Sequence, residues 1–182
     1  MEFKWIGKDC KISDWARFYS PEKITIGNNT RIDDFCVMSG GKEIIIGDYV
    51  HIACGTYLFG GGGIIIEDFV GISTHVNIWS QSDDYTGHSM FCPQIPIKFK
   101  LHQKFEQVII KKQVLIGCGV SILPGVTLGE GSMVGAHSLI TKDLLPWSLY
   151  AGIPAKKIAD VSQDMLKLRE QFLEENNIGQ II

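Results

Sequence analysis

The chain has 182 residues, a length typical of one domain with a buried core, and its net charge of −3 comes from 17 basic and 20 acidic side chains. It has no concentrated basic stripe, and no apolar run approaches the roughly 20 residues of a membrane span, which excludes nucleic-acid-binding and membrane-spanning proteins. The first ten residues lack the apolar core of a signal peptide, so we expect a cytoplasmic protein. The five cysteines form no close pairs and are expected to be free, mostly buried thiols.

Along the chain, an aliphatic residue recurs at every sixth position. The first complete rows repeat every 20 residues and align at 24–43, 44–63 and 64–83. From Ile110 to Ile140 the same spacing continues with a period of 18. A spacing of six fits neither a helix, whose faces repeat every 3.6 residues, nor an alternating strand. It predicts coils of three short strands that turn their aliphatic side chains inward, with about six coils stacked into a solid triangular prism.

A glycine follows the inward aliphatic residue in many of the predicted coils. The positions are Gly7, Gly27, Gly47, Gly117, Gly129 and Gly135. Because glycine readily adopts backbone angles that other residues avoid, we interpret these positions as tight corners with unusual backbone angles. The longer segments at 39–43 and 59–63, which carry extra glycines, are expected to be outward bulges.

The repeat is interrupted at residues 84–107. An excursion of this length in a compact domain is usually functional or disordered, and its aromatic residues and prolines argue against disorder. After the repeat, Pro146 and Pro154 mark a turn-rich exit, and residues 160–177 have the apolar spacing of a helix. We therefore divide the chain into a repeat domain at 1–158 and a C-terminal helical extension at 159–182.

Two segments late in the repeat, "VGAHSLITKD" at 134–143 and "AGIPAKKI" at 151–158, resemble the signature of the hexapeptide-repeat acyltransferases. The segments "RIDDF" at 31–35 and "SDDYTG" at 82–87 are similar to bacterial sugar acetyltransferases. The resemblance implies an all-β solenoid, a left-handed parallel β-helix, that assembles as a homotrimer with active sites between subunits. It also implies acetyl-CoA as the acyl donor, a sugar or nucleotide-sugar acceptor and no required metal.

Acetyl transfer from a thioester needs a base that relieves the nucleophile of its proton, and histidine is the usual choice because it titrates near neutrality. His88, in "TGHSM", matches the catalytic histidine of the related acetyltransferases. Asp83 and Asp84 are candidates to orient its imidazole or to hold the acceptor, although aspartate is also common in simple turns. The candidate substrate-binding residues are His75, Tyr85, His51 and Asn77.

The resemblance also places coenzyme contacts on small corner residues and on lysines, whose charges suit phosphates. The matching positions are Gly117, Cys118, Ala136, Thr141, Lys142, Lys156 and Lys157. Cys118 stands where a serine is common in the family.

These features favour acetyl transfer to a sugar hydroxyl, because a hydroxyl needs a base more than a partly neutral amine does. The alternative is N-acetylation of a nucleotide-linked amino sugar. Two other classes are a non-catalytic β-helix binding module and a zinc lyase resembling gamma-class carbonic anhydrase. A zinc site of that kind would draw on three histidines, two of them five residues apart, and no such pair exists among the five histidines of the chain.

Overall fold

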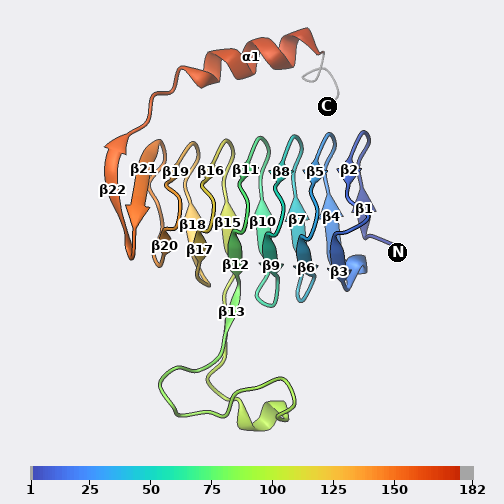
Figure 1. Ribbon diagram of the computed structural model, residues 1–182, viewed down its shortest axis with the longest axis vertical. Coiled ribbons are helices and arrows are strands. Elements are labelled where there is room, and N and C mark those ends of the chain that lie inside the picture. Colours follow the sequence, from blue (N-terminus) through green and yellow to red (C-terminus); the bar gives the residue numbers. More distant parts are fainter. Residues whose placement is uncertain (1, 177–182) are drawn as a thin grey trace.

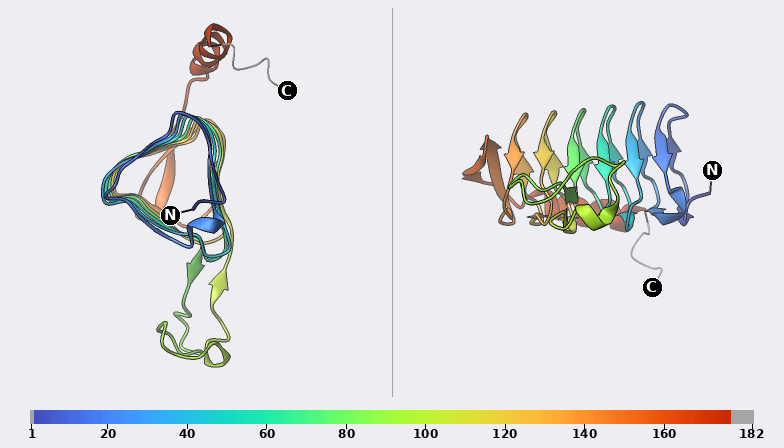
Figure 2. Two further views of the ribbon diagram at one scale, coloured as in Figure 1. Left: turned by 90° about the vertical axis from the view of Figure 1, so that its right-hand side faces the viewer. Right: turned by 90° about the horizontal axis from the view of Figure 1, so that it is seen from below.

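The computed structural model describes residues 2–176, and most of them wind into a column (Figure 1) that is three-sided in cross-section (Figure 2). The three sides are sheets of six, eight and six strands. Sheet 1 contains β1 (Trp5–Ile6), β4 (Ile24–Ile26), β7 (Ile44–Ile46), β10 (Ile64–Ile66), β15 (Val108–Ile110) and β18 (Thr127–Leu128). Sheet 2 contains β2 (Lys11–Ile12), β5 (Arg31–Ile32), β8 (His51–Ile52), β11 (Gly71–Ile72), β16 (Leu115–Ile116), β19 (Met133–Val134), β21 (Ser148–Gly152) and β22 (Ala155–Asp160). Sheet 3 contains β3 (Arg17–Tyr19), β6 (Val37–Ser39), β9 (Tyr57–Phe59), β12 (Asn77–Trp79), β17 (Ser121–Ile122) and β20 (Leu139–Ile140).

Aliphatic side chains of the same strand position stack inside the column. Ile26, Ile46 and Ile66 are in register on neighbouring parallel strands, and each is at most 1% exposed. Each inward side chain therefore packs against the side chains of the coils above and below, which fills the interior at the density of a protein core. The predicted solid prism is confirmed.

The glycines after the inward residues have a different role from the predicted one. None of the six has a positive φ, so the expectation of unusual backbone angles was wrong. A side chain at Gly27 would overlap the backbone carbonyl of Gly47, and a Cβ at Gly117 would lie 2.7 Å from N of Ala136. Glycine is needed here because the next coil passes too close for a Cβ. The positive φ angles fall two residues later, for example at Asn29 (53°) and Tyr49 (57°).

After β12 the chain leaves the column as a hairpin that we call the arm, residues 81–106 (Figure 2). Its strands β13 (Gln81–Ser82) and β14 (Lys104–Phe105) pair antiparallel, and a short 3-10 turn, η2 (Ile97–Phe99), lies in its loop. The excursion thus starts at Gln81 rather than at residue 84. Its root is anchored by the fully buried Ser80, whose Oγ donates to O of Phe59 (2.7 Å) and accepts from N of Gly62 (3.0 Å).

The C-terminal segment folds back along the column. β22 pairs antiparallel with β21 and ends the column at Asp160, an element that the repeat did not predict. The helix α1 (Met165–Glu175) then lies over the corner between sheets 1 and 2, where the ring of Phe172 packs against Tyr49 and Phe69 with centroids 5.2 and 6.2 Å apart. The remaining short 3-10 turn, η1 (Pro21–Lys23), joins β3 to β4. No helix within residues 2–176 has the length and apolar character to cross a bilayer.

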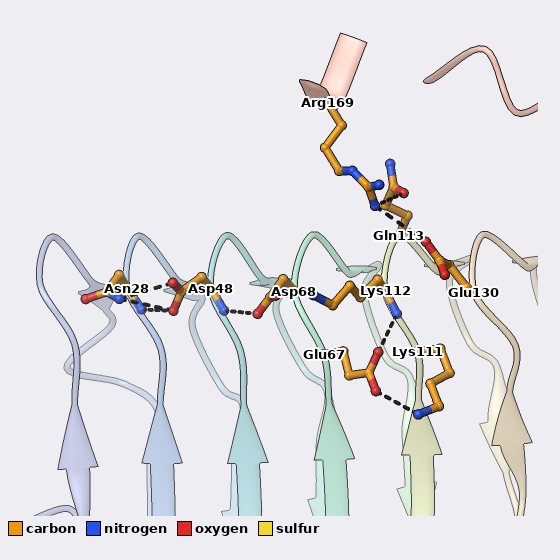
Figure 3. A network of polar contacts seen from close by, with 9 residues as sticks. All are labelled: Asn28, Asp48, Glu67, Asp68, Lys111, Lys112, Gln113, Glu130 and Arg169. Atoms are coloured by element: carbon orange, nitrogen blue, oxygen red, sulfur yellow. Dashed lines mark hydrogen bonds and ion pairs between the residues drawn. The ribbon is translucent and has the colours of Figure 1, made fainter. Parts of the chain in front are cut away.

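A ladder of polar side chains runs along the same corner (Figure 3). Asp48 Oδ1 accepts from N of Asn28 (2.6 Å), and Asp68 Oδ1 accepts in turn from N of Asp48 (3.0 Å). Each carboxylate accepts a hydrogen bond from a backbone amide of the preceding coil. These bonds connect neighbouring coils at the corner, where no strands pair. Arg169 joins α1 to it through a 2.8 Å hydrogen bond from Nη1 to Oε1 of Gln113.

Candidate active site

A cavity of about 1010 Å³ lies where the arm leaves the column. Trp79, Leu123 and Thr141 line it from the column, and both strands of the arm line the other side. The polar arm residues that line it include Asp83, Asp84, Tyr85, Thr86, His102 and Gln103, together with Lys100 and Lys104. An apolar wall with a few convergent polar groups is the composition of small-molecule sites.

Asp84 builds the turn at which the loop of the arm begins. Its Oδ1 accepts from Oγ1 (2.5 Å) and N (2.8 Å) of Thr86, and its Oδ2 accepts from N of His88 (2.8 Å). These hydrogen bonds, first of all the one from the Thr86 hydroxyl, favour the charged carboxylate and lower the pKa of Asp84 from 3.8 to about 2. Asp84 is therefore a poor proton acceptor near neutral pH, and its role in this structure is to shape the turn.

His88 lies on the arm beyond this turn and is exposed. Its Nδ1 is 2.7 Å from Oγ1 of Thr86, and its ring centroid is 6.0 Å from that of His102, which lines the cavity. His88 itself does not line the cavity. Within residues 2–176, Nε2 of His88 has no hydrogen-bond partner, so this nitrogen is available to a ligand or to another copy of the chain.

Asp83, the residue after β13, faces the cavity. Its Oδ1 accepts a 2.7 Å hydrogen bond from Nε2 of Gln103, a residue of the opposite side of the hairpin. Asp83 and Gln103 lie one residue beyond the paired residues Ser82 and Lys104 of the hairpin. Because Gln103 fixes one carboxylate oxygen, the other can face a cationic group of a ligand.

Of the predicted substrate-binding residues, only Tyr85 lines the cavity, and it is 93% exposed. His75 lies at the corner between sheets 2 and 3 in a left-handed conformation (φ 57°), with its ring above Gly55. Asn77, on β12, donates from Nδ2 to O of His75 (3.4 Å). The structure therefore does not bring His75 and Asn77 into the cavity.

His51 lies on the outer face of sheet 2, also away from the cavity. Its Nε2 is 2.8 Å from Oδ2 of Asp33, and Nε of Arg31 is 2.6 Å from the other oxygen. Burial alone would raise the pKa of Asp33, but the hydrogen bonds and charges of His51 and Arg31 outweigh it and lower the pKa. His51 is therefore engaged by a carboxylate on this face of the column.

The predicted coenzyme-binding residues all lie on the last coils, but in separate places. Gly117 and Cys118 form a corner between sheets 2 and 3, and Ala136 lies directly against Gly117 in the next coil. Thr141 lines the cavity, and the exposed Lys142 follows it.

Lys156 and Lys157 lie on β22, and both are exposed. Nζ of Lys157 is 2.6 Å from Oδ1 of Asp160, and this hydrogen bond raises the pKa of Lys157. The charge of Lys157 is already matched by a carboxylate, so Lys156 is the better candidate for a phosphate contact.

Reasoning from the sequence missed Thr86, Gln103 and Trp79. Thr86 stands two residues from both Asp84 and His88, a spacing that an Asx-turn interpretation of "DYTGH" would have identified. Gln103 carries no such local signal, because its contact with Asp83 depends on the register of the arm. Within residues 2–176, no three His, Cys, Asp or Glu side chains gather in an arrangement suited to a metal ion.

Comparison with known proteins identifies the family. The model of the family "Bacterial transferase hexapeptide (six repeats)" matches residues 107–142. The dTDP-4-amino-4,6-dideoxy-D-glucose acyltransferase of Escherichia coli is 43% identical over 174 residues, which cover 94% of this chain and 90% of that protein. The match therefore includes the arm as well as the column.

Solved structures show the same likeness. AntD, an N-acyltransferase from Bacillus cereus in complex with dTDP and 3-hydroxybutyryl-CoA, superposes with a TM-score of 0.92 at 41% identity, covering 96% of this chain and 92% of that chain. A hexapeptide-repeat acetyltransferase from Vibrio cholerae in complex with acetyl-CoA has a TM-score of 0.60 at 23% identity and covers 88% of this chain and 73% of that chain, a likeness of fold alone. The predicted fold class, a left-handed parallel β-helix, is confirmed, and this chain belongs to the hexapeptide-repeat acyltransferases.

Proposed function

We propose that this protein transfers an acyl group from a coenzyme A thioester to the amino group of a nucleotide-linked 4-amino-4,6-dideoxy sugar. The observation that carries the proposal is the 43% identity to the Escherichia coli dTDP-4-amino-4,6-dideoxy-D-glucose acyltransferase over 94% of this chain. A single-residue variant of the N-acyltransferase AntD, solved with dTDP-4-amino-4,6-dideoxyglucose and coenzyme A, supports it at 41% identity.

Acylation of a sugar hydroxyl, the reaction favoured from the sequence, is less well supported than its alternative. The argument for it was that a hydroxyl needs a base more than an amine does. An amino sugar, however, is partly protonated near neutral pH, and its ammonium group must also lose a proton before the nitrogen can attack. A histidine base is therefore compatible with both acceptors and does not distinguish them.

The site offers a role for each charged group. Asp83, with one oxygen held by Gln103, binds the ammonium group of the acceptor. Nε2 of His88 takes one proton from it, and the freed amine attacks the thioester carbonyl carbon. The C–N bond forms and the C–S bond breaks, while the second proton of the nitrogen passes to the departing sulfur. The products are an amide, free coenzyme A and the proton on His88.

We further propose a homotrimer in which the arm of one copy packs against its neighbour. Large apolar side chains that are exposed in the single chain are concentrated on the arm: Tyr85, Met90, Phe91, Ile97, Phe99, Leu101 and Phe105. An apolar patch of this kind on a projecting hairpin is typical of a protein interface. In such an assembly His88 would lie at a subunit boundary, with the coenzyme along the last coils at Gly117, Cys118, Ala136, Thr141, Lys142 and Lys156.

The proposed location is the cytoplasm. The five cysteines are free, which fits a reducing compartment.

The test is an acyl-transfer assay with acetyl-CoA and with 3-hydroxybutyryl-CoA against a panel of acceptors. The panel contains dTDP-4-amino-4,6-dideoxyglucose, the corresponding 4-hydroxy sugar nucleotide and free glycosides. We expect turnover of the amino sugar and a product that survives mild alkaline hydroxylamine, which cleaves esters and leaves amides intact. A hydroxylamine-sensitive product, or turnover of glycosides alone, would refute N-acylation.

A further inference from the structure

Three polar side chains, Asp84, Thr86 and His88, are linked in series on the arm. Oγ1 of Thr86 lies 2.5 Å from Oδ1 of Asp84 and 2.7 Å from Nδ1 of His88. Asp84 also accepts from the amides of Thr86 and His88, both at 2.8 Å. The backbone of this turn and the three side chains are therefore held by the same carboxylate.

The number of available protons decides the direction of each hydrogen bond. The Thr86 hydroxyl has one proton, and a 2.5 Å contact between two oxygens requires a proton between them. Asp84 is ionised near neutral pH because its pKa is about 2, a value set first by the hydrogen bond from the Thr86 hydroxyl, and it can only accept. The hydroxyl proton must therefore point to Asp84.

The second contact of Thr86 then has only one possible direction. With its proton committed to Asp84, Oγ1 can only accept from His88, so Nδ1 of His88 must carry the proton. A neutral imidazole holds one N–H, and Nε2 is then an unprotonated acceptor. Which ring nitrogen is protonated depends on the partner of the other one.

We propose that Thr86 is a positioning residue that holds His88 in the Nδ1-protonated tautomer and leaves Nε2 free to accept the substrate proton. The proposal rests on the proposed function, in which His88 is the base. The arrangement also suits the protonated state, because a proton on Nε2 leaves the bond from Nδ1 to Thr86 unchanged. The titratable groups that face the imidazole of His88 are the carboxylate of Asp84, linked to the ring through the hydroxyl of Thr86, and His102, whose ring centroid is 6.0 Å away.

The tautomer of His88 can be determined by NMR in the substrate-free protein. In protein labelled with ¹⁵N-histidine, at a pH above the imidazole titration, long-range ¹H–¹⁵N spectra should show Nδ1 of His88 protonated and Nε2 unprotonated. In Thr86→Val, which keeps the shape of the side chain and removes the hydroxyl, this pattern should be lost. Thr86→Ser should restore it. An Nε2-protonated His88 in the wild-type protein would overturn the proposal.

Kinetics test whether the tautomer matters for the reaction. For Thr86→Val we expect kcat to fall by about 10- to 100-fold, part of the contribution that a general base makes, while KM for the acyl-CoA stays near the wild-type value. Thr86→Ser should recover most of kcat, and the matched control Thr25→Val, on β4, should behave as wild type.

Two kinetic outcomes would overturn the positioning role of Thr86. A wild-type kcat in Thr86→Val overturns the positioning role, and so does an equal loss in Thr86→Ser. Failure of the proposed function is read separately, from the wild-type product assay, because the tautomer is measured in the substrate-free protein.

Discussion

The column and the arm are built in different ways. Inward side chains of the column, such as Ile46 and Ile66, are at most 1% exposed and repeat the same contacts from coil to coil. On the arm, Leu101 is 74% exposed and Tyr85 is 93% exposed, and the turn depends on the side chain of Asp84. The column therefore distributes its stability over many equivalent contacts, whereas the geometry of the arm depends on a few groups. Substitutions in the two regions should affect different properties.

The largest effect is expected on activity, from the arm. His88→Ala should lower acyl transfer by about 10²- to 10⁴-fold, the contribution of a general base, while the melting temperature stays near that of the wild type because His88 is exposed. Steady-state kinetics and a thermal melt measure both. Equal turnover of variant and wild type would remove His88 from the mechanism.

The largest effect on stability is expected from the column. Ile66→Ala should lower the free energy of unfolding by about 2–5 kcal/mol, because the cavity would be enclosed by neighbouring coils. The matched control is Ile6→Ala, on β1 at the end of the same sheet, where the side chain is 44% exposed. It should lose roughly half as much. Urea unfolding measures both free energies. Equal losses in the two variants would contradict a core in which the inner coils enclose Ile66 more fully than the first coil encloses Ile6.

A third substitution tests the junction of the two regions. A Cβ at Gly62 would overlap O of Ser80 and lie 2.5 Å from N of Glu106, so Gly62→Ala should displace the root of the arm, destabilise by about 1–3 kcal/mol and reduce turnover. Gly71→Ala is the control, because its Cβ would meet only the flexible side chain of Leu115, at 3.0 Å. Calorimetry and kinetics should separate the two variants. Wild-type stability and turnover in Gly62→Ala would show that the arm tolerates movement at its root.

A smaller effect tests the predicted coenzyme contacts on the last coils. Lys142→Ala and Lys156→Ala should weaken coenzyme A by about 2- to 10-fold each, because exposed charge pairs contribute little. Dephospho-CoA, which lacks the 3′-phosphate, should be affected less. Isothermal titration measures both ligands, and identical losses for both would argue against a contact with that phosphate.

The smallest effect is a pH response confined to the arm. The pKa of Asp84 is lowered from 3.8 to about 2, so the carboxylate stabilises the folded arm above pH 3.8 and loses this contribution as the pH falls through about 2. The protection of the Thr86 and His88 amides against hydrogen exchange, relative to the intrinsic rate at each pH, should therefore fall over this range, before that of amides in β7 or β10. Simultaneous loss of protection in arm and column would contradict independent behaviour.

Much of the column could be predicted from the sequence, because its period places each residue in the same environment as its counterparts. Ile46 lies between Ile26 and Ile66 in the structure as it does in the aligned rows. The reason for the glycines could not be predicted from a single coil. The clash that excludes a side chain at Gly27 is with the backbone of the following coil, and it exists only after the coils are stacked.

The candidate site was predicted only in part. His88, Asp83 and Asp84 do lie on the arm, but His51 and His75 lie on other faces of the column, because strand alternation and corner position determine where a side chain points. The different contacts of the two aspartates could not be predicted from "SDDYTG" either. Asp84 is committed to the turn, whereas Asp83 faces the cavity opposite Gln103.

The sequence by itself determined the winding of this chain, its aliphatic core and its family, since a repeated spacing of six specifies local contacts that every coil makes with its neighbours. Only the tertiary structure decided which carboxylate is bonded to Gln103, which nitrogen of His88 lies against Thr86 and where the cavity lies. These properties depend on hydrogen bonds within a hairpin that breaks the repeat, where no periodic neighbour imposes a geometry.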